Sequence, residues 1–331
     1  MTLSRKQFLT LTLAGAGAAA LVRPRFATAQ QAAPNISRIK YVTIGAPDVD
    51  AVEAAYTGWL GHTTVERSQV SETMALSWGT PNMAGRPFVL MRPMTGEDVL
   101  IRAVETEAVD GYAPMKTIGW NAFEIICDDI DDLHARLIDG SPFEHIGGPA
   151  NLGGGTSSIR AAQYVGPGGE VLYFNCETGD RSKSGLPDPG EDVGRTNIVI
   201  LASHDVTATM DAYRQMFGMG QGFSRPQPIG VISEMQGLPA DHSYVLGFNG
   251  LGEPGNAIEF DQYLEQFGPR PRAMGMLPQG NALVSFNVED LDAVAADFFG
   301  APIEEYGGRR SATFAGPAGE LVELIEEKRR T

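Results

Sequence analysis

The stretch GPAGELVEL, from Gly316 to Leu324, has a near copy 150 residues upstream, GPGGEVLYF, from Gly166 to Phe174. The glycines, the proline and the turn glutamate match, and the apolar pattern after the turn continues in both copies as it does in a β-strand. One position differs, because Glu323 in the later copy corresponds to Tyr173 in the earlier one. The pair predicts a repeated turn-and-strand unit and raises the question of what the additional carboxylate does.

Two further pairs of segments repeat. DVDAVEAAYTGWLG (48–61) and DVTATMDAYRQMFG (205–218) share an opening Asp-Val, a tyrosine and a closing glycine at the same spacing. DIDDLHARL (129–137) matches DLDAVAADF (290–298), so all four segments are expected to be helices that begin at an aspartate N-cap. Offsets of 157 and 161 residues relate the pairs, which indicates two similar halves of two units each.

A strand-like run precedes each expected helix, at residues 39–45, 121–127, 197–202 and 283–288. Short extended pieces separated by glycine-rich turns follow each helix. Each unit, called a module below, is therefore predicted to have the order β-α-β-β-β. A polar segment rich in Gly and Pro, residues 178–194, is predicted to link the two halves.

These motifs resemble the vicinal oxygen chelate superfamily, the fold of glyoxalases, bleomycin-resistance proteins and extradiol dioxygenases. The matching residues are the helix ends Tyr56 to Gly61 and Tyr213 to Gly218, and the turns that begin at Gly166 and Gly316. The resemblance covers about residues 36 to 327 in four modules. It implies an α+β fold of tandem βαβββ modules, in which paired curved mixed sheets enclose cavities, with glyoxalase-like domains over 36–177 and 195–327.

Members of that superfamily bind metal through a histidine on the first strand of a module and a glutamate on the last. The first-strand positions in this sequence hold Tyr41, Trp120 or Asn121, Asn197 and Leu283, so no module keeps the histidine. The last-strand positions hold Tyr173 in module two and Glu323 in module four, and module three offers Glu259. The resemblance therefore disfavours an iron site with histidine ligands and leaves two carboxylates in the C-terminal half.

Strand alternation predicts which side chains share a face. Ser285 and Asn287 are expected to face the same cavity as Glu323, and Tyr41 is expected beside Tyr173 in the other half. The second strand of the N-terminal half leaves two inward sets open, Ala122 with Glu124 or Asn121 with Phe123.

Glu259 and Glu323 are the predicted catalytic pair. Facing one cavity, they would bind a divalent cation together with Asn197, or one of them would act as a general base. The alternative is that they lie in ordinary surface ion pairs. His242 opens an expected strand and is either a further substrate contact in this cavity or a loop histidine.

Cys127 ends the first strand of module two and Cys176 ends its last strand. The resemblance makes these strands neighbours in a sheet, which implies a structural disulfide. The alternative is two buried thiols that pack as small apolar groups.

Charge and the N-terminus bear on location. The formal net charge is −16, and without the four cations of the first 29 residues it is about −20, which disfavours binding to nucleic acid or to anionic membranes. SRKQFL (4–9) resembles a twin-arginine export motif, an apolar run and Ala27-Thr28-Ala29 follow, and the alternative is an uncleaved anchor. We expect a periplasmic or secreted protein.

The sequence favours an enzyme of lyase, isomerase or hydrolytic type that acts on a small oxygenated or aromatic metabolite. The competing interpretation is a binding protein that sequesters such a ligand without chemistry, and a ring-cleaving dioxygenase is the third. The expected partner is a small molecule, and a divalent metal and a homo-oligomer remain open.

Overall fold

The computed structural model describes residues 34–152 and 158–328. The predicted export signal lies outside these residues. Among the described residues, no helix has the length and apolar character needed to cross a membrane.

The helices and strands follow the predicted modules. Module one contains β1 (Ile36–Ala46), α1 (Val49–Trp59), β2 (Thr63–Gln69), α2 (Glu72–Ser77), β3 (Pro87–Arg92) and β4 (Leu100–Glu105). Module two contains β5 (Gly119–Cys127), α3 (Ile130–Leu137), β6 (Glu144–Asn151), β7 (Ile159–Val165) and β8 (Val171–Glu177). Module three contains β9 (Val193–Ser203), α4 (Val206–Phe217), β10 (Phe223–Pro228), α5 (Gly230–Gln236), β11 (Ser243–Gly250) and β12 (Ala257–Gln262). Module four contains β13 (Gly280–Val288), β14 (Ser311–Ala315) and β15 (Leu321–Glu326).

The tandem-module α+β fold is confirmed, but the helix predicted at 290–298 is wrong. Residues 289–310 contain no helix, and module four has three strands. Phe298 forms a β-bridge with Phe314, and the Phe299 amide donates to the carbonyl of Thr313 at 2.9 Å. Pairing with the edge of β14 therefore replaces helical hydrogen bonds in this segment.

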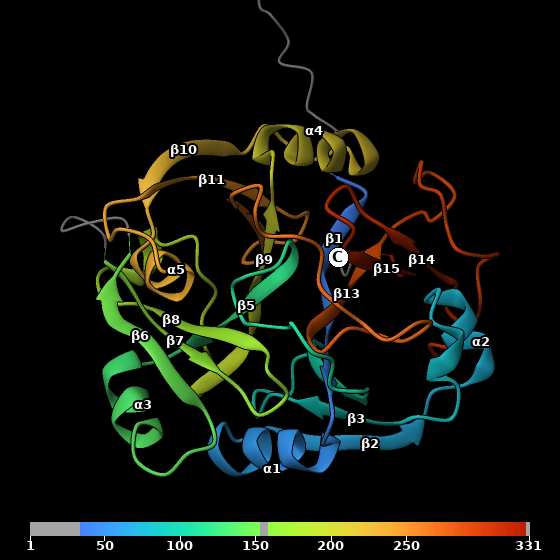
Figure 1. The fold of residues 1–331 in the computed structure, drawn as a ribbon, viewed down its shortest axis with the longest axis horizontal. Coiled ribbons are helices and arrows are strands. Elements are labelled where there is room, and N and C mark those ends of the chain that lie inside the picture. Colours follow the sequence, from blue (N-terminus) through green and yellow to red (C-terminus); the bar gives the residue numbers. More distant parts are fainter. Residues whose placement is uncertain (1–33, 153–157, 329–331) are drawn as a thin grey trace, which may run out of the picture. The chain divides into compact units, whose positions relative to one another are not determined.

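The modules combine across the two halves of the chain. A seven-stranded sheet has the order β14-β15-β13-β1-β4-β3-β2, so it joins module four to module one. An eight-stranded sheet, β10-β11-β12-β9-β5-β8-β7-β6, joins module three to module two. The joining pairs, β1 with β13 and β5 with β9, are both antiparallel. Figure 1 shows β1 (blue) beside β13 (orange), although they come from opposite ends of the described chain. The sheets thus divide the chain differently from the expected halves 36–177 and 195–327.

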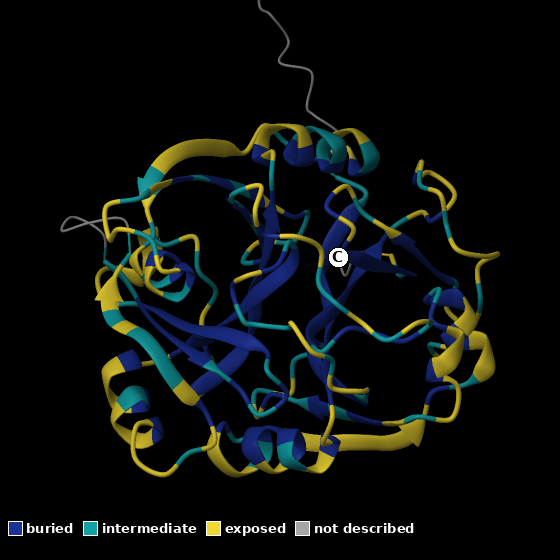
Figure 2. Ribbon diagram, in the orientation of Figure 1, coloured by how far each residue is buried: buried dark blue, intermediate teal, exposed yellow. Residues whose placement is uncertain are grey.

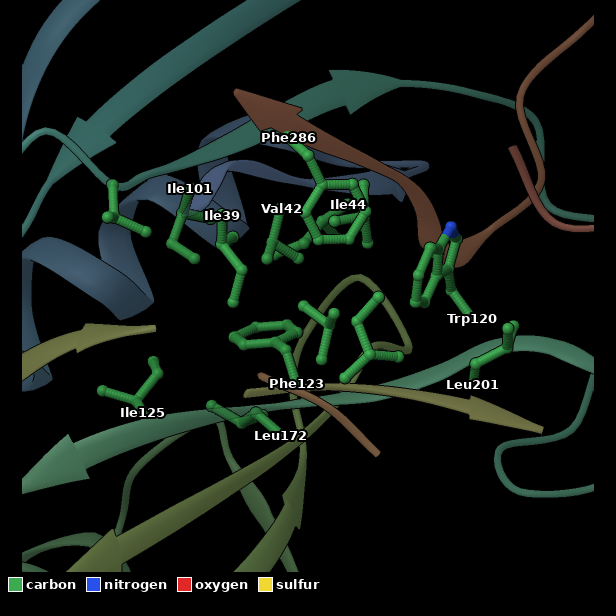
Figure 3. Close-up of a cluster of buried hydrophobic side chains, with 14 of the residues drawn as sticks. Ile39, Val42, Ile44, Ile101, Trp120, Phe123, Ile125, Leu172, Leu201 and Phe286 are labelled. Atoms are coloured by element: carbon green, nitrogen blue, oxygen red, sulfur yellow. The ribbon is translucent and has the colours of Figure 1, made fainter. Parts of the chain in front are cut away.

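The main hydrophobic core lies between the two sheets. Figure 3 shows Ile39, Val42 and Phe286 of the seven-stranded sheet meeting Phe123 and Leu201 of the eight-stranded sheet. All five are at most 1 % exposed, and burial of each such side chain stabilises the fold by about 1.5–3 kcal/mol. The edge strands β2, β6 and β10 are largely exposed, as their yellow segments in Figure 2 show. We call the face of each sheet that packs against the other sheet its near face, and the opposite face its far face.

The repeated turn that opens β8 and β15 is built around its glutamate. The carboxylate of Glu320 accepts a hydrogen bond from the Ala318 amide at 2.8 Å, and that of Glu170 accepts one from the Gly168 amide at 2.9 Å. A Cβ at Gly316 would lie 1.9 Å from Oε1 of Glu320, so only glycine fits there. The repeated motif thus provides the space and the backbone amide that the buried glutamate of the turn requires.

Candidate active site

Glu323 lies on the far face of the seven-stranded sheet and is fully buried. Its Oε1 accepts hydrogen bonds from the Trp78 indole at 2.7 Å and from the Tyr306 hydroxyl. Its Oε2 accepts from the Arg102 guanidinium at 3.0 Å and from the Ser285 hydroxyl. The predicted approach of Ser285 to Glu323 is thus confirmed.

This network leaves Glu323 little capacity for chemistry. Its side chain and that of Arg102 are each 1 % exposed, so the two charges neutralise one another away from water. Arg102 also donates to Thr43 at 2.9 Å and lies over the rings of Tyr41 and Trp78. A carboxylate with four donors has no lone pair directed at open space. We therefore assign Glu323 a structural role.

Glu259 lies on β12, in the eight-stranded sheet, so the predicted cavity shared by Glu259 and Glu323 is wrong. The sequence shows two carboxylates at equivalent strand positions, but modules three and four join different sheets. Joint ligation of one cation by this pair is excluded by the same separation. Among residues 34–152 and 158–328, no three His, Cys, Asp or Glu side chains are placed to hold a metal ion.

A second group of acids lies with Glu259 on the far face of the eight-stranded sheet. Glu124 of β5 is 3 % exposed and Asp261 of β12 is 1 % exposed. The Asn175 side chain donates a hydrogen bond to Glu124. Ala122 packs on the far face whereas Phe123 packs between the sheets, so the predicted set of Ala122 with Glu124 is the one that faces the site. We call Glu124, Glu259 and Asp261 the carboxyl cluster.

The carboxyl cluster is electrostatically perturbed. Burial raises the pKa of Glu124 to about 7, against a bond from Asn175 that lowers it. Burial and the nearby charge of Glu124 raise the pKa of Asp261 to about 7. Burial and both neighbouring carboxylates raise the pKa of Glu259 well above its usual range. Burial and mutual repulsion therefore disfavour ionisation of all three acids at once, and carboxyl groups perturbed in this way are common in catalytic sites.

Several buried polar atoms on or next to strands of the eight-stranded sheet have no hydrogen-bond partner in the part of the chain that the structure describes. Both carboxylate oxygens of Asp261 and the hydroxyls of Tyr173 and Tyr263 have no hydrogen-bond partner among the described residues. The same holds for the side-chain amides of Asn121 and Asn197. Buried polar atoms in native proteins are nearly always satisfied, so this concentration marks a place where water or a ligand completes the bonds.

The other predicted residues divide between the two sheets. Tyr41 lies with Glu323 beside Arg102 and Tyr306, while Tyr173 lies with the carboxyl cluster, so their expected shared cavity is wrong. Asn287 bonds Arg38 at 2.9 Å and Glu327 at 3.1 Å, away from both acid groups. His242 packs edge-on against Tyr244, which belongs to the same hydrophobic cluster as Tyr173 on the far face of the eight-stranded sheet.

The cysteines lie on neighbouring strands, as the resemblance implied, because β5 and β8 pair in parallel. Both are buried free thiols, and the Cys127 thiol donates to the carbonyl of Asn175 at 3.4 Å. The predicted disulfide is therefore not formed in this structure.

Asp261 and Tyr263 were missed in the sequence. EFDQY (259–263) places acid, acid and phenol at every second residue, so strand alternation alone puts all three on one face. Asp261 could have been found from that spacing. Arg102 gives no such signal, because nothing local shows that it pairs with a residue 221 positions away.

Known structures share this arrangement of modules. Glyoxalase I from Zea mays is 15 % identical, with a TM-score of 0.58 over 88 % of this chain and 92 % of that chain. A Bacillus subtilis protein described as a dioxygenase is 13 % identical, with a TM-score of 0.56 over 90 % of this chain and 87 % of that chain. No protein-family model and no curated protein matches the sequence. At these identities the likeness concerns the fold, and the chain has the fold of the vicinal oxygen chelate superfamily.

Proposed function

We propose that this protein is an enzyme of lyase or isomerase type that transfers a proton on a small oxygenated or aromatic metabolite. The substrate would bind at the far face of the eight-stranded sheet, beside the carboxyl cluster. The carrying observation is Asp261, a buried carboxyl whose two oxygens lack partners among the described residues and whose pKa is raised to about 7. A carboxyl that titrates near neutrality is suited to both halves of a proton transfer.

The neighbouring groups supply the remaining functions. Asp261 would take a proton from a carbon next to a carbonyl group, and the electron pair would move onto the carbonyl oxygen. Tyr173 and Tyr263 would donate hydrogen bonds to that oxygen, since burial raises the pKa of both phenols and keeps them protonated. Return of the proton to another carbon completes an isomerisation, and expulsion of a leaving group completes an elimination.

Glu124 would tune the base. Its bond from Asn175 fixes its position, and its charge raises the pKa of Asp261. Aromatic side chains of Tyr244, Tyr263 and Phe267 pack on the same face and favour an aromatic or otherwise planar substrate.

Exchange of carbon-bound hydrogen in D₂O, followed by NMR, tests the proposal without knowledge of the final product. The probes are enolisable ketones, beginning with hydroxyacetone, acetophenone and phenylacetone. We expect exchange at one carbon of at least one probe, at a rate that rises with pH through about 7 because Asp261 must be ionised. Asp261→Asn should reduce this rate at least 100-fold.

Glu265→Gln is the matched control, because the Glu265 side chain is 88 % exposed and should not affect exchange. Equal exchange in Asp261→Asn and in the parent would overturn the assignment of the base. Saturable binding of a probe without exchange would instead support the sequestering protein, because the unpaired atoms would then serve binding only. Absence of both binding and exchange over the panel would contradict both functions.

Export belongs to the same proposal. We infer from the N-terminal motif that the protein acts in the periplasm or outside the cell. Fractionation of cells that express the full chain, with Arg5→Lys as the comparison, tests this directly, and retention of the parent chain in the cytoplasm would contradict it.

A further inference from the structure

A pocket of about 130 Å³ lies where the beginnings of β5, β13 and β15 approach the segment 269–272. Trp120, Asn281, Arg270, Arg272 and Glu320 contribute to its lining. Its volume corresponds to about four water molecules in the liquid, enough for one small polar group.

Arg270 brings to this pocket a positive charge that has no carboxylate partner among the described residues. Its guanidinium donates to the carbonyls of Trp120 at 2.5 Å and Asn281 at 2.6 Å, and to the Thr117 hydroxyl at 3.2 Å. These acceptors are all neutral. Within residues 34–152 and 158–328, Arg270 forms no ion pair, in contrast to the buried Arg102.

The guanidinium keeps free donors. It has five N–H groups and uses three of them, one on each of its nitrogens, so two N–H groups remain. Arg270 is half-buried, and partial burial lowers the pKa of its guanidinium. Because its partners, including the Tyr112 ring at 5.2 Å, are all neutral, an incoming anion would supply the opposite charge that this site lacks.

The surroundings define what kind of anion fits. Arg272 is exposed and lines the same pocket, so it can approach an anion from the solvent side. Glu320 is the acid of the lining, and burial raises its pKa to about 7. Its carboxyl group is engaged by the Tyr213 hydroxyl at 2.7 Å and by the Ala318 amide, so it does not compensate Arg270.

Arg270 also lies near the phenol of Tyr263, which neighbours Asn121, the residue after Trp120. The three acids of the carboxyl cluster are not among the residues that line the pocket.

We propose that Arg270 and Arg272 form an oxyanion-binding subsite for a small carboxylate. A carboxylate matches the planar guanidinium, which binds it through two parallel hydrogen bonds. Phosphate shares this chemistry and is the competing ligand in the test. Anion binding at this subsite does not depend on the proposed function.

Calorimetric titration of the folded chain with benzoate, and separately with inorganic phosphate, at constant ionic strength tests the subsite. We expect saturable binding of benzoate with one site per chain. Arg270→Lys should weaken it at least tenfold, because lysine keeps the charge but loses the paired donors. Arg272→Gln should weaken it about threefold to tenfold, by loss of one exposed charge.

Arg225→Gln is the control, since Arg225 lies on the exposed edge strand β10 and should leave affinity unchanged. If Arg270→Lys does not fold, Arg272→Gln against Arg225→Gln still decides the question. Absence of saturable benzoate binding, or equal weakening in the control, would overturn the subsite, and tighter binding of phosphate would overturn the carboxylate.

The two proposals fail separately. Neutral ketones do not need the arginines, so exchange in D₂O without benzoate binding would remove the subsite and keep the proton transfer. Benzoate binding without exchange would do the opposite.

Discussion

The hydroxyl of Tyr213 donates a hydrogen bond of 2.7 Å to the turn carboxylate of Glu320, and the hydroxyl of Tyr56 donates one of 3.2 Å to Glu170. In both cases a helix of one module bonds the last turn of the following module. These modules belong to different sheets, so each bond ties the seven-stranded sheet to the eight-stranded one. The repeated helix motif and the repeated turn motif therefore contact each other, and this contact occurs twice in the protein.

The turn glutamates should make stability depend on pH. Burial raises the pKa of Glu320 from 4.5 to about 7, so the folded state favours its protonated form. The resulting stabilisation is complete below about pH 4.5 and is lost as pH rises through about 7. Between pH 5 and pH 8 the parent should lose up to about 3 kcal/mol more unfolding free energy than Glu320→Gln.

Urea unfolding at both pH values measures this difference. Glu170→Gln should behave in the same way, since burial also raises the pKa of Glu170 to about 7. Parallel pH profiles for the parent and both variants would show that these carboxyl groups titrate normally.

Gly316→Ala should destabilise the fold by about 1–3 kcal/mol, because the new Cβ would collide with the Glu320 carboxylate. Gly58→Ala is the matched change, since Gly58 lies in α1 with open space at its Cβ position. It should stabilise the protein by about 0.5–1 kcal/mol. Thermal unfolding of both variants tests the contrast, and an equal effect in the two would refute the steric explanation.

Glu323→Gln should cost about 3–5 kcal/mol of unfolding free energy, because it leaves the buried charge of Arg102 without its partner. Replacement of both residues by methionine should recover most of that loss, since it removes both charges from the interior. Tyr306→Phe, which deletes one of the donors to Glu323, should cost about 1–2 kcal/mol. Denaturant titrations of the parent and the three variants test these values. A loss of less than about 1 kcal/mol in Glu323→Gln would mean that the ion pair is not buried in solution.

The two thiols should join under oxidising conditions. Cys127 and Cys176 lie on paired strands, and interaction with the Cys127 thiol lowers the pKa of Cys176 to about 7, which favours its thiolate. Closing the loop of 48 residues between them should stabilise the protein by about 4 kcal/mol. Mass spectrometry after mild oxidation should show a loss of about 2 Da without dimers, and Cys176→Ser should abolish both effects.

Local patterns predicted most of the secondary structure, because capping and alternation act over a few residues. Asp48 and Asp205 each cap a helix by accepting from the amide three residues on, at 2.9 Å, and the strands lie where β-branched runs predict them. The segment 290–298 has the same Asp-start pattern but no helix, because Phe298 pairs with a strand that is distant in sequence. Propensity is overridden where a long-range partner offers the same hydrogen bonds.

The candidate site was only partly predictable. Strand alternation correctly grouped Tyr173 with residues of one sheet face, now seen to be the far face that also holds Glu259, because alternation needs no knowledge of the partner strand. Which acids share a face depends on which modules join edges, and the first strands of all four modules look alike in sequence. The predicted pairing of Glu323 with Glu259 failed for this reason, and Arg102 reaches Glu323 only because module one joins module four.

The joining of module one to module four also has a consequence for folding during synthesis. The eight-stranded sheet uses strands between residues 119 and 262, so all of its edges are available before β13 leaves the ribosome. β1 can pair with β4 early, but its other edge must wait for β13, and this pairing of high contact order gives the seven-stranded sheet a slower route. Until then the apolar strand β1 is an unpaired edge, exposed to aggregation, and a chain shortened before β13 would keep that edge permanently.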